Sequence, residues 1–166
     1  MQTMEHTVDQ EEEIVLTQSG LESIEEELRR LVTVERPEVA NRIRDAKDFG
    51  DLTENAEYEA AKTAQAFVEG RIIDLKRILA SARILSEDEV RTDAVGIGST
   101  VTVRDLEYGD DWTLKVVSPY EANPDDDLIS DLSPVGRALM GHKVGDQVTV
   151  NTPGGTTRYE ITAITK

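Results

Sequence analysis

Two long stretches of helical hydrophobic spacing, joined by a short segment that contains glycine, constrain this chain more than any other feature. Between residues 16 and 85, apolar side chains recur mostly at intervals of three, four and seven residues, which is the period of an amphipathic α-helix. The first stretch contains Leu21, Ile24, Leu28, Leu31, Val32, Val39, Ile43 and Ala46, and the second contains Ala56, Ala60, Thr63, Phe67, Val68, Ile72, Leu75, Leu79 and Ala82. Two such stripes on either side of Phe49-Gly50 predict an antiparallel helical hairpin with arms of about 30 residues, each roughly 45 Å long.

The first helical stretch contains an interruption. From Val32 onward its apolar residues continue one position out of frame, and the slip brackets Pro37. Because a proline inside a helix costs about 3 kcal/mol, we expect a kink or a restart of the helix there. At the start of the stretch, Ser19 is followed three residues later by Glu22, a capping-box pattern that predicts Ser19 as the N-cap.

Beyond residue 98 the hydrophobic period changes from that of helices to that of strands. Apolar and polar residues alternate in four short runs, which is typical of half-buried antiparallel strands. The apolar positions of these runs are Val101 and Val103, then Trp112, Leu114 and Val116, then Val148 and Val150, and finally Tyr159, Ile161 and Ala163. Ser133-Pro134 followed by Gly141 predicts one short helix, and Pro153-Gly154-Gly155 predicts a hairpin turn.

These patterns predict the α+β class: a long N-terminal antiparallel helical hairpin, or coiled coil, followed by a small β-sheet domain with one short helix. We expect an acidic N-terminal tail at 1–15, the hairpin at 16–88 with its tip near 48–55, a linker at 89–98 and the sheet domain at 99–166. The tail has no hydrophobic period, and the linker is polar and contains glycine.

The charge balance and the residue inventory exclude several classes of function. A formal net charge of −16 argues against sequence-independent nucleic-acid binding, which needs Lys and Arg to displace counterions from phosphates. The charge suits a partner with a basic surface or a site that needs carboxylates, and solubility alone explains it equally well. The absence of cysteine excludes disulfides, thiolate catalysis and cysteine-based metal sites. Without a secretory signal or an apolar run of about 18 residues, we expect a cytoplasmic protein that does not span a membrane.

The tip of the predicted hairpin carries three acidic side chains, Asp48, Asp51 and Glu54. If the second helix begins at Asp51, the carboxylates of Asp51 and Glu54 lie on one edge of its first turn and could face a single cation. Mg²⁺ prefers oxygen ligands and often takes only one or two protein carboxylates. The same spacing is also a capping-box pattern that satisfies free backbone N–H groups, and the two roles are compatible.

The segment from Gly50 to Tyr58 closely resembles the hairpin-tip signature of the bacterial Gre transcript cleavage factors, a family of transcription elongation factors, and of the GreA type in particular. Further motifs follow in the family's order, and only about the first 15 residues lie outside the likeness. These motifs are Leu16-Thr17 with Gly20-Leu21 and Glu27-Leu28, Arg36-Pro37-Glu38, Phe67 to Ile72, Leu128-Ile129-Ser130, Ser133-Pro134, and Asn151 to Gly155.

The resemblance implies a partner and a mechanism. The sheet domain is expected to be FKBP-like and to dock, through Ser133 and Pro134, at the rim of the secondary channel of bacterial RNA polymerase. The hairpin then reaches the active centre, where Asp51 and Glu54 act as the catalytic acids and share a Mg²⁺ ion only within the polymerase complex. The expected outcome is stimulated cleavage of backtracked nascent RNA by the polymerase itself, which rescues arrested complexes. The chain alone is expected to be a monomer, to bind no cofactor and not to be an enzyme.

The family pattern also implies supporting residues near the tip. Asn55 and Tyr58 belong to the matched motif and are expected to support the acids. Lys47 and Lys62 occupy the positions of basic residues that meet the RNA 3′ end, although a solvated helix face explains the two lysines equally well.

Three other functions stay open at this point. A Gre homologue could bind the channel and inhibit the polymerase, although the presence of both Asp51 and Glu54 disfavours this. An FKBP-like domain could be a prolyl isomerase, but such a site needs an aromatic-lined apolar pocket. The C-terminal half offers Tyr108, Trp112, Tyr120 and Tyr159 for it. A passive coiled-coil adapter would not depend on the tip acids.

Overall fold

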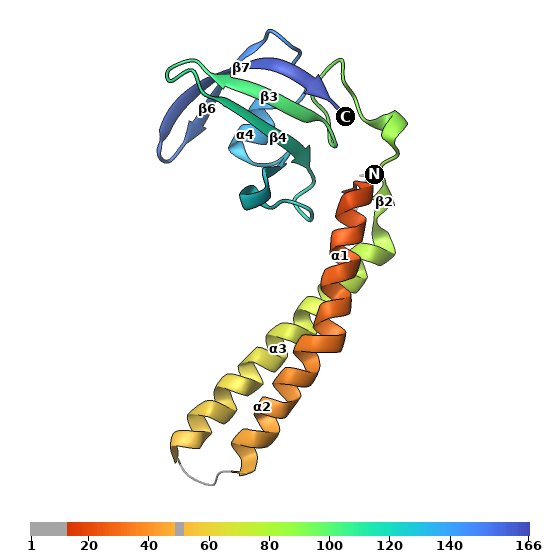
Figure 1. Cartoon of the computed structure of the whole chain (residues 1–166), viewed down its shortest axis with the longest axis vertical. Helices are drawn as coiled ribbons and strands as arrows, with labels where there is room; N and C mark the ends of the chain where they lie inside the picture. The colour runs from red at the N-terminus through yellow and green to blue at the C-terminus, as the bar shows by residue number, and fades with distance from the viewer. Residues whose placement is uncertain (1–12, 49–51) are drawn as a thin grey trace, which may run out of the picture.

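A long helical hairpin projects from a small curved sheet domain in the computed structural model of the chain (Figure 1). The structure describes residues 13–48 and 52–166, and for residues 52–55 it describes the backbone alone. The first arm consists of α1 (Gln18–Arg30), the π-helical turn η1 (Leu31–Glu35) and α2 (Arg36–Asp48), and the second arm is α3 (Leu52–Ser81). The predicted α+β class, with a hairpin followed by a sheet domain, is confirmed. In the part of the chain that the structure describes, no helix is long and apolar enough to cross a membrane.

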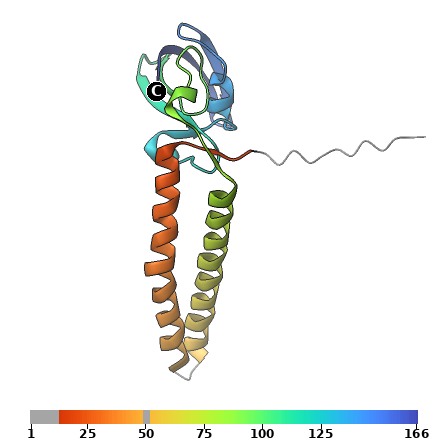
Figure 2. The same ribbon diagram turned by 90° about the vertical axis from the view of Figure 1, so that its right-hand side faces the viewer.

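An apolar seam holds the two arms side by side along their length (Figure 2). Its buried members are Leu16, Ile24, Leu31, Val39 and Ile43 from the first arm and its approach, and Ala61, Val68, Ile72, Leu75 and Ile78 from α3. Burying a large aliphatic side chain stabilises a fold by about 1.5–3 kcal/mol. At 1.5 Å per residue, the 30 residues of α3 make a rod about 45 Å long.

Two ion pairs flank this seam and connect the arms. Arg36 donates to both carboxylate oxygens of Glu69, at 2.7 and 2.8 Å, and Arg71 donates to both oxygens of Glu27, at 2.7 and 3.0 Å. The Arg36 hydrogen bonds hold the pKa of the Glu69 carboxyl below its ordinary value. Each pair is about half exposed, so the seam and not the ion pairs supplies most of the stability.

The first arm contains a widened helical turn at the position of the predicted interruption. Leu31 and Val39 are both buried in the seam although they are eight residues apart, one more than a heptad. The π-helical turn η1 accommodates the extra residue, and the backbone N–H of Arg36 donates to the carbonyl of Leu31, five residues earlier. Pro37, which has no N–H to donate, is the second residue of α2, just beyond this turn. The helix therefore continues rather than restarts, and the shift of frame is absorbed.

The prediction of Ser19 as the N-cap of the first helix is wrong. Thr17 holds that position: its backbone is extended, and its Oγ1 accepts a hydrogen bond from the Gly20 N–H at 3.1 Å. Ser19 already lies within α1. Since an N-cap needs a non-helical backbone, the capping-box spacing placed the cap two residues too late.

Two short parallel strands close the base of the hairpin. β1 (Val15–Leu16) pairs with β2 (Arg83–Ile84), and Arg83 forms ion pairs with Glu13 and Glu89, each at 2.7 Å. Glu89 ends the 3-10 turn η2 (Glu87–Glu89), which follows β2. The start of the described chain is thereby fixed to the end of α3.

The sheet domain contains a five-stranded sheet with the short helix α4 (Pro134–Leu139) packed against it (Figure 1). The strands are β3 (Thr100–Asp105), β4 (Asp111–Val117), β5 (Leu128–Ser130), β6 (Gln147–Thr152) and β7 (Gly155–Thr165), and the 3-10 turn η3 (Pro124–Asp126) precedes β5. Their order is β5-β4-β3-β7-β6, with β5 parallel to β4 and the other pairs antiparallel.

The core of the sheet domain confirms most of the predicted inward positions. Its buried members are Val95, Val101, Val103, Leu114, Val116, Ile129, Leu139, Val148, Ile161 and Ile164. Val95 joins this core from the segment before β3, and its N–H donates to the carbonyl of His142 at 2.9 Å. Among the described residues, the core of the sheet domain and the seam of the hairpin have no member in common.

The predicted alternation is wrong at Ala163. The register between β3 and β7 shifts after the pair formed by Thr102 and Ala163, so Thr162 is an extra residue in β7. Such a β-bulge moves the inward position by one residue. Ile164, at 8% exposure, is therefore buried in place of Ala163.

The packing of the seam predicts that two nearby aliphatic residues of α3 contribute very differently to the free energy of unfolding. Leu75 is fully buried, whereas Ile73 is 66% exposed. Leu75→Ala is expected to lower the free energy of unfolding by about 2–5 kcal/mol because it leaves a cavity in the seam. Ile73→Ala is expected to change it by less than about 0.5 kcal/mol. Urea unfolding followed by circular dichroism at 222 nm measures both, and equal losses would contradict this packing.

Candidate functional site

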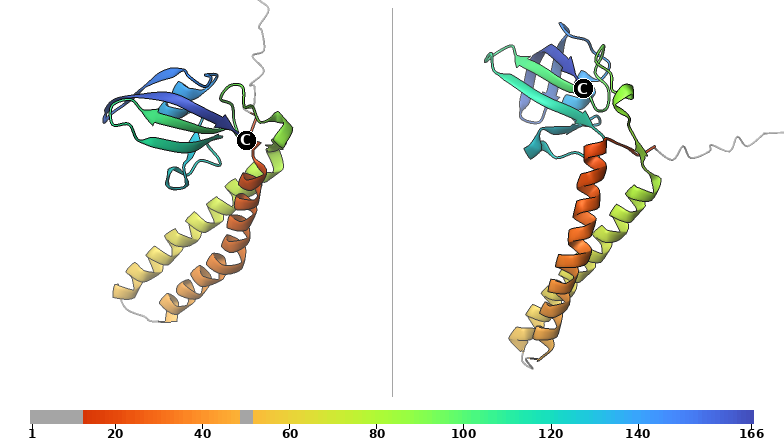
Figure 3. Two further views of the ribbon diagram at one scale, coloured as in Figure 1. Left: turned by 45° about the horizontal axis from the view of Figure 1, so that its top comes forward. Right: turned by 45° about the vertical axis from the view of Figure 1, so that its right-hand side comes forward.

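The distal end of the hairpin is the part of the described chain farthest from the sheet domain (Figures 1 and 3). There α2 ends at Asp48 and α3 begins at Leu52. Asp51, the first predicted catalytic acid, lies outside the described residues. Glu54 and Asn55 lie in the first turn of α3, and their side chains are also outside the description. The roles assigned to these three residues stay predictions.

Three of the predicted tip residues lie together, with two lysines beside the aromatic ring of Tyr58. Tyr58 is half-buried and packs against the seam. The ammonium groups of Lys47 and Lys62 each lie 5.9 Å from the centre of its ring. Lys47 comes from the last turn of α2, and Lys62 follows Tyr58 by one turn on α3. A cation near an aromatic face is attracted by about 0.5–1 kcal/mol at an exposed site, so Tyr58 favours this grouping of charges from both arms.

This cluster of Lys47, Tyr58 and Lys62 has the chemistry of a phosphate contact. Both lysine side chains are exposed, so their ammonium groups are accessible to a ligand. Lysine acts toward phosphate as a compact point charge with three donors. Lys47 precedes the acidic motif in the sequence, and Tyr58 lies one helical turn after Glu54. The cluster therefore puts positive charge beside the acidic motif in a chain that is otherwise strongly negative.

No complete metal site lies within the described side chains: no three of His, Cys, Asp or Glu there are grouped closely enough to hold a metal ion. The two predicted ligands, Asp51 and Glu54, are not among those side chains. Their carboxylates are of the oxygen-donor type that Mg²⁺ prefers.

The predicted docking residues Ser133 and Pro134 begin α4 and lie on the sheet domain, away from the tip. The Ser133 hydroxyl accepts from the Gly136 N–H at 3.1 Å and donates to the Ser130 carbonyl at 2.6 Å. Ser133 is thus the N-cap of α4, as its sequence pattern predicts. Pro134 is exposed, and Leu132 beside it is 50% exposed, so this corner of the domain is accessible.

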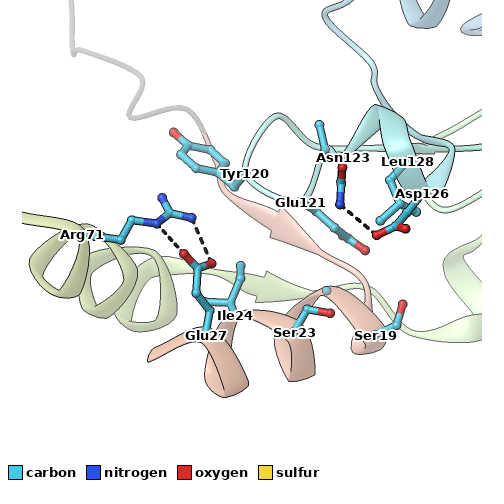
Figure 4. Close-up of a pocket in the computed structure, with 12 residues that line it drawn as sticks. Ser19, Ser23, Ile24, Glu27, Arg71, Tyr120, Glu121, Asn123, Asp126 and Leu128 are labelled. Carbon is cyan, nitrogen blue, oxygen red and sulfur yellow. Dashed lines mark hydrogen bonds and ion pairs between the residues drawn. The ribbon is translucent and has the colours of Figure 1, made fainter. Parts of the chain in front are cut away.

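A hollow of about 320 Å³ lies between the first three turns of α1, Arg71 of α3 and the loop before β5 (Figure 4). On its hairpin side, the Glu27 carboxylate forms the ion pair with Arg71 and raises the pKa of that guanidinium through the side-chain hydrogen bond. On its sheet side, Glu121 points toward the start of α1. The sequence analysis missed Glu121, because its partner Thr17 is 104 positions away along the chain.

Comparison with known proteins identifies the class to which this architecture belongs. Residues 14–84 match the family described as transcription elongation factor, N-terminal, and residues 90–166 match the one described as transcription elongation factor, GreA/GreB, C-term. The chain belongs to the GreA/GreB family of transcription elongation factors.

Within this family the chain is similar to proteins named transcription elongation factor GreA. It is 48% identical over 157 residues to that of Syntrophomonas wolfei, which covers 95% of this chain and 99% of the relative. It is 50% identical over 154 residues to that of Alkaliphilus oremlandii, which covers 93% and 97%. Among solved structures, GreA factor homolog 1 (Gfh1) of Thermus thermophilus is 35% identical, with 93% of this chain and 99% of that chain covered and a TM-score of 0.45.

The cluster around Tyr58 predicts a specific spectroscopic signature. In the wild-type protein, ring currents are expected to move the Hε signals of Lys47 and Lys62 upfield of those of Lys76, an exposed lysine farther along α3. In Tyr58→Leu, which keeps an apolar side chain but removes the ring, the three lysines should give similar shifts. Carbon–proton correlation spectra measure this. Identical Hε shifts in both proteins would show that the ammonium groups do not lie near the ring.

Proposed function

We propose that this protein is a transcript cleavage factor. It inserts its hairpin into the secondary channel of bacterial RNA polymerase and stimulates the polymerase's own Mg²⁺-dependent cleavage of backtracked nascent RNA. Membership of the family supplies the process, transcription elongation. The observation that carries the proposal is the shape of the hairpin: arms about 45 Å long turn back beside the acidic motif, far from the sheet domain. A rod of two helices is long and thin enough to enter a channel that would exclude a globular domain.

The proposed chemistry depends on Asp51 and Glu54. In two-metal hydrolysis of a phosphodiester, two ions about 3.5–4 Å apart stabilise the attacking and leaving oxygens. Within the polymerase complex, the Asp51 and Glu54 carboxylates would help hold a second Mg²⁺ beside the one that the polymerase binds tightly, and they would orient the attacking water. The contribution of this chain is positioning, which can lower a barrier by several kcal/mol. Alone, the chain is proposed to have no activity and no bound cofactor.

The lysines of the tip cluster are proposed to contact the RNA. Lys47 and Lys62 would face phosphates of the displaced 3′ segment, held in place by Tyr58. Their shared position on one ring supports this, because two charges from different arms converge where a single phosphate backbone could meet both. Asn55 is proposed to support the acids from the same helical turn as Glu54.

The sheet domain is proposed to dock at the rim of the channel through Ser133 and Pro134. The exposed corner formed by Leu132 and Pro134 supports this, since an accessible apolar side chain on a polar surface suits a protein partner. The factor is proposed to act as a cytoplasmic monomer with the polymerase and the nascent RNA as its partners.

The tip acids are tested by a cleavage assay on a backtracked elongation complex with Mg²⁺. Wild-type protein is expected to release short 3′ RNA fragments. Asp51→Asn and Glu54→Gln keep the side-chain shape but remove the charge, and each is expected to reduce the rate on the order of 100-fold or more, because a metal ligand is lost. Glu57→Gln, an exposed neighbour on α3, is the matched control and should cleave normally.

Two outcomes would decide against this mechanism. Full cleavage by Asp51→Asn would refute the role of the tip acids. A wild-type protein that binds and slows the polymerase without releasing fragments would instead identify an inhibitory homologue.

The lysines are tested by the salt dependence of the same reaction. Each phosphate contact that is lost reduces the slope of log rate against log salt concentration by about one. Lys47→Gln and Lys62→Gln, assayed at factor concentrations well below saturation, are expected to show that smaller slope. Lys76→Gln should match the wild type. If all three variants give the wild-type slope, the two lysines belong to a solvated helix face.

A further inference from the structure

A carboxylate of the sheet domain binds Thr17, the N-cap of the first helix of the hairpin. Glu121 accepts two hydrogen bonds from Thr17: its Oε2 accepts from the backbone N–H at 3.1 Å, and its Oε1 accepts from the hydroxyl. The Thr17 hydroxyl in turn accepts from the Gly20 N–H as the N-cap of α1. Glu121 therefore fixes the side chain that starts the long helix.

The site is shaped to hold this carboxylate. Glu121 is 9% exposed, the one charged side chain classed as buried among the described residues. A buried carboxylate is costly unless donors satisfy it, and Thr17 supplies two. A Cβ at Gly20 would overlap the Glu121 carboxyl group, so the absence of a side chain at this helical position leaves the space that the carboxylate fills.

The charge of Glu121 also complements the helix that it meets. The first turn of α1 contains no acidic residue of its own. Negative charge at a helix N-terminus stabilises the helix, and here it comes from the other domain. Lys115 of β4 adds a second polar contact to the same turn, from its Nζ to the Ser19 hydroxyl at 3.4 Å.

Within the described chain, no core shared by the hairpin and the sheet domain fixes the direction of the hairpin, so polar contacts at its base can determine that direction. The two hydrophobic clusters have no described residue in common, and a hollow of about 320 Å³ lies beside the contact (Figure 4). A hairpin about 45 Å long amplifies small movements at its base, so a rotation of about 10° moves the tip by about 8 Å. Catalytic groups tolerate displacements of only about 1 Å.

We propose that Glu121 is a positioning residue: by binding Thr17 across the domain boundary, with Gly20 providing the space, it sets the direction in which the sheet domain aims the hairpin tip. This structural role depends only on the contacts. Its consequence for RNA cleavage rests on the proposed function.

The direction of the hairpin is measured as a distance between two spin labels. The chain contains no cysteine, so Glu59→Cys on α3 and Thr149→Cys on β6, both exposed, give two unique label sites in the full-length protein. Pulsed electron–electron double resonance should give one narrow distance distribution for the labelled protein. Adding Glu121→Ala or Gly20→Ala is expected to broaden the distribution or shift its mean by several Å.

Two control variants distinguish an effect on the direction of the hairpin from an effect on folding. Gly70→Ala also adds a methyl group to a hairpin helix, but nothing lies within 4 Å of it, and Glu107→Ala removes an exposed carboxylate from the β3–β4 turn. Both should keep the narrow distribution. If Glu121→Ala loses helical circular dichroism, Gly20→Ala decides, because alanine forms helices better than glycine.

The combination of both changes tests whether they act through one contact. In the Gly20→Ala, Glu121→Ala double variant, the broadening should equal that of either single variant rather than add. An unchanged distribution in both single variants overturns the inference, and so does full additivity.

The cleavage assay then separates the two proposals. At saturating factor, Glu121→Ala and Gly20→Ala are expected to lower the cleavage rate at least tenfold, while Gly70→Ala keeps it. Wild-type cleavage rates combined with a broadened distance distribution would refute the link between aiming and cleavage. Absence of cleavage with the wild-type protein would refute the proposed function and leave the distance result intact.

Discussion

The apolar seam between the two arms is the interaction on which the rest of the structure depends. The described hairpin has no third helix to share the burial, so its buried residues on α1, α2 and α3 carry most of its stability. The ion pairs of Arg36 with Glu69 and of Arg71 with Glu27 keep the arms in register at the margins of that seam. Everything proposed for the tip requires that this rod stay straight and paired out to its end.

The hairpin and the sheet domain are each stabilised by a hydrophobic core of their own. The sheet domain can therefore fold and support the base of the hairpin without sharing a core with the hairpin. Polar groups are placed at both ends of the hairpin. Lys47, Tyr58 and Lys62 lie together at the distal end, and Glu121 contacts Thr17 at the base. One end is proposed to serve phosphate and metal chemistry, and the other end is proposed to set the direction of the hairpin.

Local patterns in the sequence predicted most of the fold. The helical period located both arms, the alternation located four strands, and Ser133 marked the cap of α4. The misses have identifiable physical causes. The β-bulge in β7 inserts one residue, which the alternating period does not anticipate, so Ile164 and not Ala163 faces the core. The shift of frame in the first arm was visible in the sequence, but its form, a π-helical turn instead of a kink or restart, was not. The cap on α1 was placed two residues too late, and its partner Glu121 was missed because the contact joins distant parts of the chain. The spacing of the sequence singled out the acids at the tip, whereas their catalytic roles came from the family resemblance and stay predictions.

The central claim is that the hairpin tip reaches the reactive RNA 3′ end inside the polymerase. A photoreactive amino acid in place of Ala56, an exposed residue beside the tip, tests this in a backtracked elongation complex with radiolabelled RNA. The same substitution at Ser81, the exposed end of α3 near the sheet domain, is the control. The account predicts crosslinks to the 3′ segment of the RNA from position 56 and none from position 81. Crosslinks of equal yield from both positions, or from position 81 alone, would contradict it.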